Sequence, residues 1–386
     1  MERMVSIQSS SRDTNKQQKQ KQQQQKTKNK KKKGGKRNFQ YYFIFLFLIF
    51  VFFVFIDQPE FNKYSIQLSS STFTRKGNNA LSSKNPHHET IDDIDVLWAS
   101  PPPTFPSSRH NNHPPPCGIL FVAHGCQHSH TDWFTDCEDC LGLPEELAIV
   151  DIAMKRNLLV VAISSKNRRK KCWNEKIDGP RVGRVLKQFQ SRFQPYYKDV
   201  PIYAFGASSG GSFVSRLGKY IQIEGFISQI SAKKEPHPTD CVVYLTMNRD
   251  ERTDLAAKEI IRHTKKVSKH IRLQPLAITS DSFFSNRISD ISTEQSMNIV
   301  QSLRNQSYLD PLGYLSQDPR RSNWRSVVRQ FAGNDTLIAD ESKLSEVMNV
   351  AFGYHELTRD GVQEGLDYCL QLQKRSHGSS GENCNI

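Results

Sequence analysis

The chain has 386 residues, 37% of them hydrophobic, and a formal net charge of +14 at neutral pH. Residues 1–40 hold 13 basic and 2 acidic residues, a net charge of +11, so the remaining residues carry only +3. A basic body that binds nucleic acid is therefore not expected, because the positive charge belongs to one end of the chain. The rest is long enough for one large α/β domain with a sizeable core.

Residues 1–38 are rich in Gln and Lys and almost free of apolar side chains. Such a segment cannot bury enough apolar surface to fold, so we predict a disordered basic tail. The lysine run at residues 30–33, followed by Lys36 and Arg37, is also typical of a nuclear-import or nucleic-acid patch. The hydrophobic segment that follows argues against that alternative.

Residues 39–56 include an uninterrupted apolar and aromatic run from residue 41 to residue 56. The run has no polar face, which disfavours a buried core helix, and no clear cleavage site follows it, which disfavours a cleaved signal peptide. Its length is at the short end of the roughly 17 to 25 residues that a membrane-spanning helix needs. We predict a single transmembrane signal anchor. The basic tail then lies in the cytoplasm and the body in the lumen or outside the cell, as in a type II membrane protein.

Residues 57–116 are rich in Ser, Asn, His and Pro and contain two Pro triplets, at 101–103 and 114–116. This composition predicts a stem that is flexible at first and then stiffened by polyproline segments. Within it, residues 91–98 are expected to form a short strand or to pack against the domain.

The folded body, residues 117–386, alternates between buried-strand patterns and helical patterns. Strands are expected at 118–123, 158–163, 200–205, 225–230, 241–247 and 271–276, and helices from Pro144, at 181–193, from the end of the third strand to about residue 220, at 254–266 and at 358–372. This order predicts a mostly parallel central sheet with right-handed crossovers and helices on both faces.

Residues 201–214 consist of an apolar strand pattern, the sequence G-A-S-S-G and then a helix-like segment. This is the pattern of a G-x-S-x-G nucleophile elbow, in which a serine occupies a strained strand-to-helix turn. Only small residues two positions before and after the serine let the chains pass closely, and Gly206 and Gly210 meet that requirement around Ser208. Ser208 is therefore the candidate nucleophile.

The strand at 118–123 ends in His124-Gly125-Cys126. An α/β-hydrolase supplies its second oxyanion donor from the loop after such a strand, ahead of the elbow. We expect the oxyanion hole to consist of the backbone N–H of Ser209 and that of Cys126 or Gln127.

The remaining members of a Ser…Asp…His triad should follow the elbow in that chain order. Asp250 comes directly after the strand at 241–247 and is the preferred orienting acid, with Glu251 adjacent and Asp281 as the alternative. His355 lies in a loop just before the last predicted helix, where the general base belongs.

The body contains four motifs: H-G-C at 124–126, G-A-S-S-G-G at 206–211, M-N-R-D-E-R-T at 247–253 and H-E-L-T at 355–358. With these motifs, the body resembles the α/β-hydrolase superfamily. It resembles more closely the plant hydrolase-like proteins with an N-terminal signal anchor. The resemblance implies Ser208 as nucleophile, His355 as base and Asp250 as acid. It also implies a membrane-anchored serine hydrolase, of carboxylesterase, lipase or thioesterase type, that cleaves an ester or related acyl bond in a small-molecule or lipid substrate.

One alternative is a catalytically silent hydrolase-fold protein that binds a ligand or acts as a scaffold. One departure from the family is a long connection of about 75 residues between the last strand pattern and His355, which contains Trp324 and Phe331. We interpret this insertion as a lid or binding element.

All eight cysteines follow the hydrophobic run, in a compartment where disulfides can form if the anchor orientation is right. Cys137 and Cys140 are expected to pair with each other and not to bind zinc, because no second C-x-x-C is present. Cys126 has three candidate partners: Cys137, Cys140 and Cys172.

Asn305 and Asn334 begin N-glycosylation sequons, which are usable only if the body is lumenal. The sequence lacks a phosphate-binding loop, a zinc-binding helix motif and a dinucleotide fingerprint. No cofactor and no metal site are expected.

Overall fold

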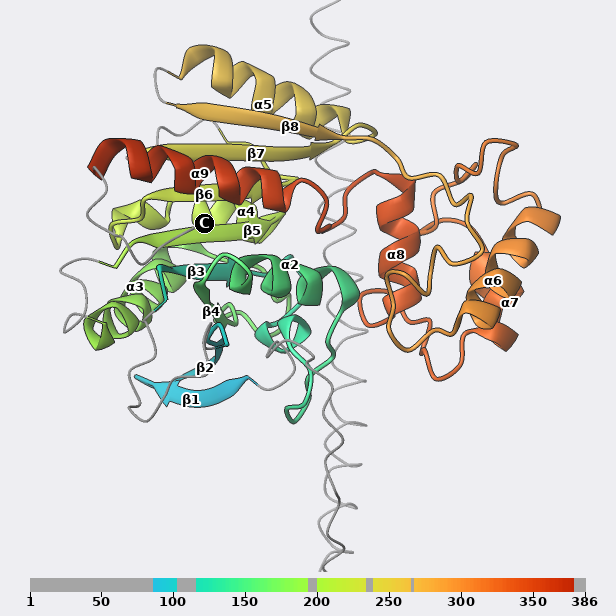
Figure 1. Cartoon of the computed structure of the whole chain (residues 1–386), viewed down its shortest axis with the longest axis horizontal. Helices are drawn as coiled ribbons and strands as arrows, with labels where there is room; N and C mark the ends of the chain where they lie inside the picture. The colour runs from blue at the N-terminus through green and yellow to red at the C-terminus, as the bar shows by residue number, and fades with distance from the viewer. Residues whose placement is uncertain (1–85, 103–115, 194–199, 234–238, 265–266, 378–386) are drawn as a thin grey trace, which may run out of the picture. The chain divides into compact units, whose positions relative to one another are not determined.

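The computed structural model describes residues 86–102, 116–193, 200–233, 239–264 and 267–377 (Figure 1). The predicted tail at 1–38 and anchor at 39–56 lie outside these ranges. Within the ranges, no helix combines the length and apolar character needed to cross a membrane.

An eight-stranded sheet forms the centre of the described part, in the order β1-β2-β4-β3-β5-β6-β7-β8. Its strands are β1 (His87–Ile91), β2 (Ile94–Ala99), β3 (Gly118–Ala123), β4 (Leu158–Ile163), β5 (Ile202–Ala207), β6 (Gly225–Gln229), β7 (Cys241–Met247) and β8 (Ser268–Leu273). The pairs from β4 to β8 are parallel, whereas β2 is antiparallel to both β1 and β4. The fold is therefore mixed α/β with a mostly parallel sheet.

Helices cover both faces of this sheet, as the alternating pattern predicts. Helices α2 (Pro144–Met154) and α9 (Val362–His377) pack on one face, and α3 (Glu175–Arg192), α4 (Ser209–Val214) and α5 (Glu251–His263) pack on the other. Strands β3, β4 and β5 are buried at every position, which explains their continuous apolar sequences. Two short 3₁₀ helices, η2 (His130–Trp133) and η3 (Leu217–Lys219), lie in the connections.

Residues 87–99, which we expected in the stem, instead form β1 and β2 of the sheet. Ile91, Ile94 and Val96 are buried in the cluster that also contains residues of α3, and this burial holds the two strands on the body. The short strand expected at 91–98 corresponds to β2. The folded body therefore begins before residue 117.

Several helix and strand ends also differ from the expectation. Helix α3 begins earlier, at Glu175, because the Asn174 side chain accepts hydrogen bonds from two backbone N–H groups of its first turn. Helix α4 ends at Val214 and does not continue to residue 220. Strand β8 ends before Pro275, which has no N–H to donate to a neighbouring strand.

Residues 276–352, called the helical insert below, occupy the long connection between β8 and His355. Helices α6 (Thr293–Asn305), α7 (Trp324–Val328) and α8 (Lys343–Phe352), with η4 (Arg329–Phe331), enclose a hydrophobic core separate from the two that flank the sheet. Trp324 and Phe284 are fully buried in it. Figure 1 shows the insert, in orange and red, beyond the C-terminal ends of β7 and β8.

An ion cluster around the buried Glu145 joins the helical insert to the body. Glu145, at the start of α2, accepts hydrogen bonds from Arg287 Nη1 of the insert at 2.8 Å and from Arg359 Nη2 at 3.0 Å. Arg287 also contacts Asp360 Oδ2 at 3.0 Å. Burial raises the pKa of Glu145, but the two guanidinium charges outweigh burial and hold the pKa below its usual range.

Three disulfides lie within the described residues. Cys137 pairs with Cys140, as expected, and Cys126 pairs with Cys172. The third joins Cys241 of β7 to Cys369 of α9, which fastens a helix to the face of the sheet that it covers.

Two buried carboxyl groups meet where α2 packs on α8. Burial, followed by the neighbouring Glu146 charge, raises the pKa of Glu346 well above its usual value, and burial raises the pKa of Glu146 to about 7. Glu346 therefore keeps its proton and donates a hydrogen bond to Glu146, while its Oε2 accepts the backbone N–H of Glu145 at 3.2 Å.

This pair predicts a loss of stability at alkaline pH. The folded protein holds these protons to a higher pH than the unfolded chain does, so their stabilisation is complete below about pH 4.5 and is lost as the pH rises through about 7. Glu346→Gln keeps a hydrogen-bond donor to Glu146 and removes the repulsion between two carboxylates. The free energy of unfolding of the wild type should fall between pH 5 and pH 8.5. For Glu346→Gln, we expect this decrease to be smaller by at least about 1 kcal/mol.

Urea unfolding at the two pH values measures this difference. Glu138→Gln, at an exposed loop position, is the matched control and should behave like the wild type. An equal decline in all three proteins would show that the carboxyl pair does not share a proton.

Candidate active site

Ser208 occupies the turn between β5 and α4. Its backbone has φ +54° and ψ −111°, and a positive φ is sterically unfavourable for a residue with a Cβ. The Ser208 N–H donates to the Gln229 carbonyl oxygen at 2.9 Å, which ties the turn to the end of β6. The serine side chain is thereby presented above the C-terminal edge of the sheet.

The two glycines of the motif are sterically required. A Cβ on Gly206 would lie 2.5 Å from the carbonyl carbon and oxygen of Gly210, and a Cβ on Gly210 would lie 2.2 Å from the Ala123 carbonyl oxygen. No real Cβ approaches backbone atoms this closely, so the strand, the turn and the helix can pass one another only with glycine at both places. The steric requirement predicted from the sequence is present at both positions.

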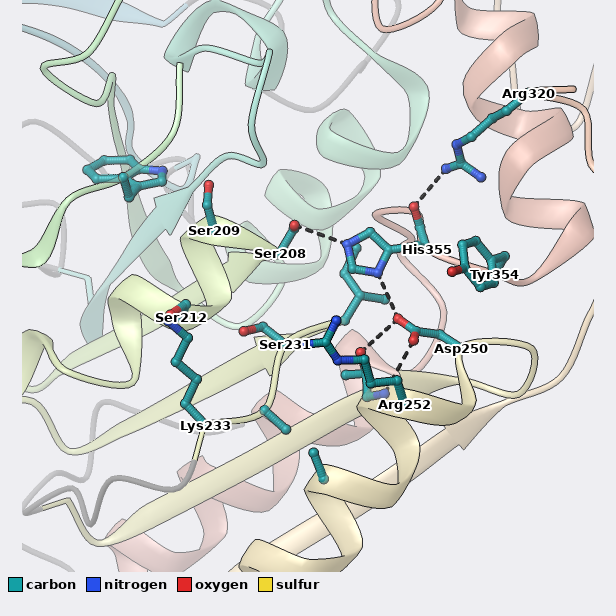
Figure 2. A pocket seen from close by; sticks show the side chains of 15 residues that line it. Ser208, Ser209, Ser212, Ser231, Lys233, Asp250, Arg252, Arg320, Tyr354 and His355 are labelled. Carbon is teal, nitrogen blue, oxygen red and sulfur yellow. Dashed lines mark hydrogen bonds and ion pairs between the residues drawn. The ribbon is translucent and has the colours of Figure 1, made fainter. Parts of the chain in front are cut away.

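Ser208, His355 and Asp250 form a hydrogen-bonded chain (Figure 2). His355 Nε2 lies 3.1 Å from Ser208 Oγ, and His355 Nδ1 lies 2.7 Å from Asp250 Oδ2. The imidazole is partly accessible, with 39% of its side chain exposed, whereas Asp250 is only 7% exposed. A base that is open to the pocket and held from behind by a buried carboxylate can take the proton of the serine hydroxyl.

Asp250 caps the N-terminus of α5. Its carboxylate accepts from Thr253 N at 3.3 Å and from Thr253 Oγ1 at 2.8 Å, besides the bond to His355. Burial raises the pKa of Asp250, but the hydrogen bonds from His355 and Thr253 together outweigh it and lower the pKa below its usual value. The carboxylate is therefore ionised at neutral pH and can stabilise a protonated imidazole.

The structure brings Asp250, and not the alternative acid, to the histidine. Asp281 is exposed in the helical insert and is not among the residues that line the pocket around Ser208. Glu251, next to Asp250, is exposed in the first turn of α5.

The His355 loop is fixed to the sheet by Gln229, a buried residue at the end of β6. Gln229 Nε2 donates to the Thr358 carbonyl oxygen at 2.9 Å, and Gln229 Oε1 accepts the Thr358 N–H at 3.0 Å. The same residue accepts the Ser208 N–H through its backbone oxygen. Gln229 therefore connects the Ser208 turn directly to the loop that carries His355.

Arg320 fixes the same loop from the helical insert. Its Nη2 donates to the His355 carbonyl oxygen at 2.7 Å and to Glu356 Oε2 at 2.8 Å. Glu356 Oε2 also accepts from Asn349 Nδ2 of α8 at 2.9 Å. The backbone of His355 is thus held by the insert as well as by the sheet.

The loop after β3 lies on the other side of the site. His124 is fully buried, and burial lowers its pKa to about 3, so it is neutral and accepts the Ser165 N–H at 3.1 Å through Nε2. Trp173 Nε1 donates to the His124 carbonyl oxygen at 2.9 Å, and the Cys126–Cys172 disulfide joins the same two segments. This loop is therefore held rigidly against the segment that precedes α3.

The oxyanion donors expected from this loop differ in availability. The Gln127 N–H donates to the Lys170 carbonyl oxygen at 3.3 Å, so this donor is already engaged. Cys126 and Gln127 are absent from the described lining of the pocket, whereas Ser209 is part of it. Of the two alternatives, Cys126 is the better candidate.

The pocket beside the triad has a volume of about 700 Å³. Its lining contains four serines, three cationic side chains and several apolar groups. The cationic side chains are Lys233, Arg252 and Arg320, and Trp173, Ile230 and Tyr354 are among the apolar residues. These cationic and apolar residues could not be assigned to the site from the sequence, because no local motif distinguishes them from surface residues.

No protein-family model and no curated protein sequence matches the chain. Among solved structures, it is similar to the dienelactone hydrolase of Anabaena variabilis, with 12% identity and a TM-score of 0.35 over 50% of this chain and 87% of the other. It is also similar to an α/β serine hydrolase without a lid from Xanthomonas campestris, with 12% identity and a TM-score of 0.34 over 59% and 98% of the two chains. An esterase of Pyrococcus furiosus gives 11% identity and a TM-score of 0.33 over 50% and 83%.

The Gln229 bridge generates a prediction about stability and reactivity. Gln229→Leu leaves the buried N–H and C=O of Thr358 without partners, which should cost about 2 to 3 kcal/mol of unfolding free energy. It should also loosen His355 and slow the reaction of Ser208 with an electrophile. Urea unfolding and the rate of covalent labelling of Ser208 measure the two effects. Gln188→Leu, at an exposed position of α3, should change neither, and equal results for both variants would remove Gln229 from the positioning of the base.

Proposed function

We propose that the chain is a serine hydrolase of the α/β-hydrolase superfamily that cleaves an ester or a related acyl bond. The observation that carries the proposal is the hydrogen-bonded chain from Ser208 Oγ through His355 to Asp250, located on a strained strand-to-helix turn that opens into a pocket. Solved hydrolases and esterases are similar to the chain, but at a level that adds no further support.

In the proposed reaction, His355 Nε2 takes the Ser208 proton as Oγ attacks the carbonyl carbon of the substrate. Asp250 accepts a hydrogen bond from Nδ1–H, which keeps the tautomer that leaves Nε2 free to accept a proton. The protonated His355 then donates its proton to the leaving group. In the second half of the reaction, His355 takes a proton from a water molecule that attacks the acyl-enzyme, and it returns this proton to Ser208 Oγ as the acid product leaves.

The negative charge that develops on the carbonyl oxygen needs donors directed at it. We assign this role to the backbone N–H groups of Ser209, at the start of α4, and of Cys126. The rigid loop around His124 favours Cys126, because a donor that is already in position adds no cost of reorganisation during the reaction. The pocket does not distinguish carboxylesterase, lipase and thioesterase activity, since specificity depends on the substrate's own groups.

We also propose that residues 39–56 anchor the protein in a membrane, with the body lumenal or extracellular. The three disulfides of the body favour an oxidising compartment. Asn305 and Asn334 are both exposed, so a glycan at either position would meet no steric obstacle in the fold.

A fluorophosphonate probe tests the catalytic proposal. The probe should label the wild-type protein and fail to label Ser208→Ala. Asp250→Asn should lower ester turnover by about 10⁴-fold with the fold preserved, because the correct histidine tautomer is lost. Asp281→Asn is the matched control and should retain turnover within about tenfold.

The same experiment separates the enzyme from a catalytically silent binding protein. A folded wild-type protein that neither reacts with the probe nor turns over any ester would favour the silent protein. A large loss confined to Asp281→Asn would contradict the assignment of the acid.

The topology proposal has an independent test. Expressed with its N-terminal segment in a eukaryotic cell, the protein should shift in mobility after glycosidase treatment. Asn305→Gln and Asn334→Gln should each remove part of the shift. A protein without any glycan, whose body is digested by protease added to the cytosolic side, would reverse the proposed orientation.

A further inference from the structure

Three cationic side chains line the pocket beside Ser208, and each comes from a different part of the fold. Lys233 follows β6, Arg252 lies in the first turn of α5, and Arg320 belongs to the helical insert. The only acidic residue in the described lining is Asp250, and its carboxylate is occupied by His355 and Thr253. The pocket therefore has a net positive charge.

The three cations differ in what already neutralises them. Arg320 is paired with Glu356 at 2.8 Å and bound to the His355 carbonyl. Among the residues that the structure describes, neither Lys233 nor Arg252 has an ion pair or a side-chain hydrogen bond. Single exposed cations are ordinary on a protein surface, but two uncompensated cations in one concave site next to a nucleophile make a field that attracts anions.

The neighbourhood of Lys233 and Arg252 is polar. Figure 2 shows Lys233 and Arg252 on the same side of Ser208, together with Ser212 and Ser231. All four residues line the pocket. Hydroxyl groups beside an ammonium and a guanidinium can complete the hydrogen bonding of an oxyacid group, and the planar guanidinium can bind a carboxylate through two parallel N–H bonds.

We propose that Lys233 and Arg252 select acyl substrates that carry a carboxylate a few atoms from the scissile carbonyl. This inference rests on the proposed serine hydrolase and names its substrate class. His355 and Ser208 carry out the bond cleavage, and the two cations hold the remote carboxylate without taking part in proton transfer. Both side chains are exposed and screened by water, so each contributes a moderate part of the selectivity.

A matched pair of substrates tests the proposal: 4-nitrophenyl hydrogen adipate, which is anionic, and its neutral methyl ester, which has the same acyl chain. The wild type should prefer the anionic substrate in kcat/KM by about tenfold, which corresponds to about 1.4 kcal/mol. Arg252→Gln and Lys233→Gln should each lower this preference, the ratio of the two kcat/KM values, by at least about threefold, mainly through the KM of the anionic substrate. Raising the salt from about 20 mM to about 500 mM should also reduce the preference.

Arg262→Gln is the matched control, because it removes the same charge from an exposed position on the same helix, α5, away from the pocket. It should keep the preference of the wild type. If the wild type cleaves both esters equally well, or if the preference survives in Arg252→Gln and Lys233→Gln, the substrate class is wrong. In that case, Ser208-dependent cleavage of the neutral ester would still uphold the proposed hydrolase.

A binding measurement covers the case in which no ester is turned over. Adipate should bind to the Ser208→Ala protein by calorimetry, and more weakly to the double variants that also carry Arg252→Gln or Lys233→Gln. Phosphate serves as the comparison anion. Absence of adipate binding, or stronger binding of phosphate at equal concentration, would overturn the carboxylate assignment whether or not the protein is a hydrolase.

Discussion

The backbone of Ser208 is the constraint on which the site depends. A residue with a Cβ at φ +54° is unfavourable by itself, so the surrounding structure must hold it there. Three features do so: the close passage allowed by Gly206 and Gly210, the hydrogen bond from Ser208 N–H to the end of β6, and the burial of β5 on both faces. The parallel sheet thus holds Ser208 in a backbone conformation that the isolated peptide would not keep.

The elbow could be predicted from the sequence because its cause is local. The steric need for small residues two positions either side of Ser208 is met within five consecutive residues, 206–210, and β5 is a plain apolar run. Asp250 and His355 followed from chain order, since the carboxyl ends of parallel strands meet at one edge of a sheet. The distance from His355 Nδ1 to Asp250 then distinguishes this acid from Asp281, which the sequence alone had left open.

What the sequence did not reveal depends on contacts between distant segments. Gln229 and Arg320 are 126 and 35 residues from His355 along the chain and reach its loop only through the fold. Strands β1 and β2 lie in a polar region directly before the first Pro triplet, and their apolar patterns are too short to stand out from a stem. The hydrogen bond from the Gln127 N–H to the Lys170 carbonyl oxygen also joins segments that no local pattern connects.

His355 is held in place from two independent sides. Gln229 holds the backbone at Thr358 from the sheet, and Arg320 holds the carbonyl of His355 itself from the helical insert. The insert has its own core and is joined to the body by the buried Glu145 cluster, so the packing of α8 on α2 also bears on the base. Because Arg320 is neutralised by Glu356 in performing this role, it is less available to a substrate anion than Lys233 and Arg252. The attachment of the insert therefore explains why Arg320 differs from Lys233 and Arg252 in its availability to a substrate.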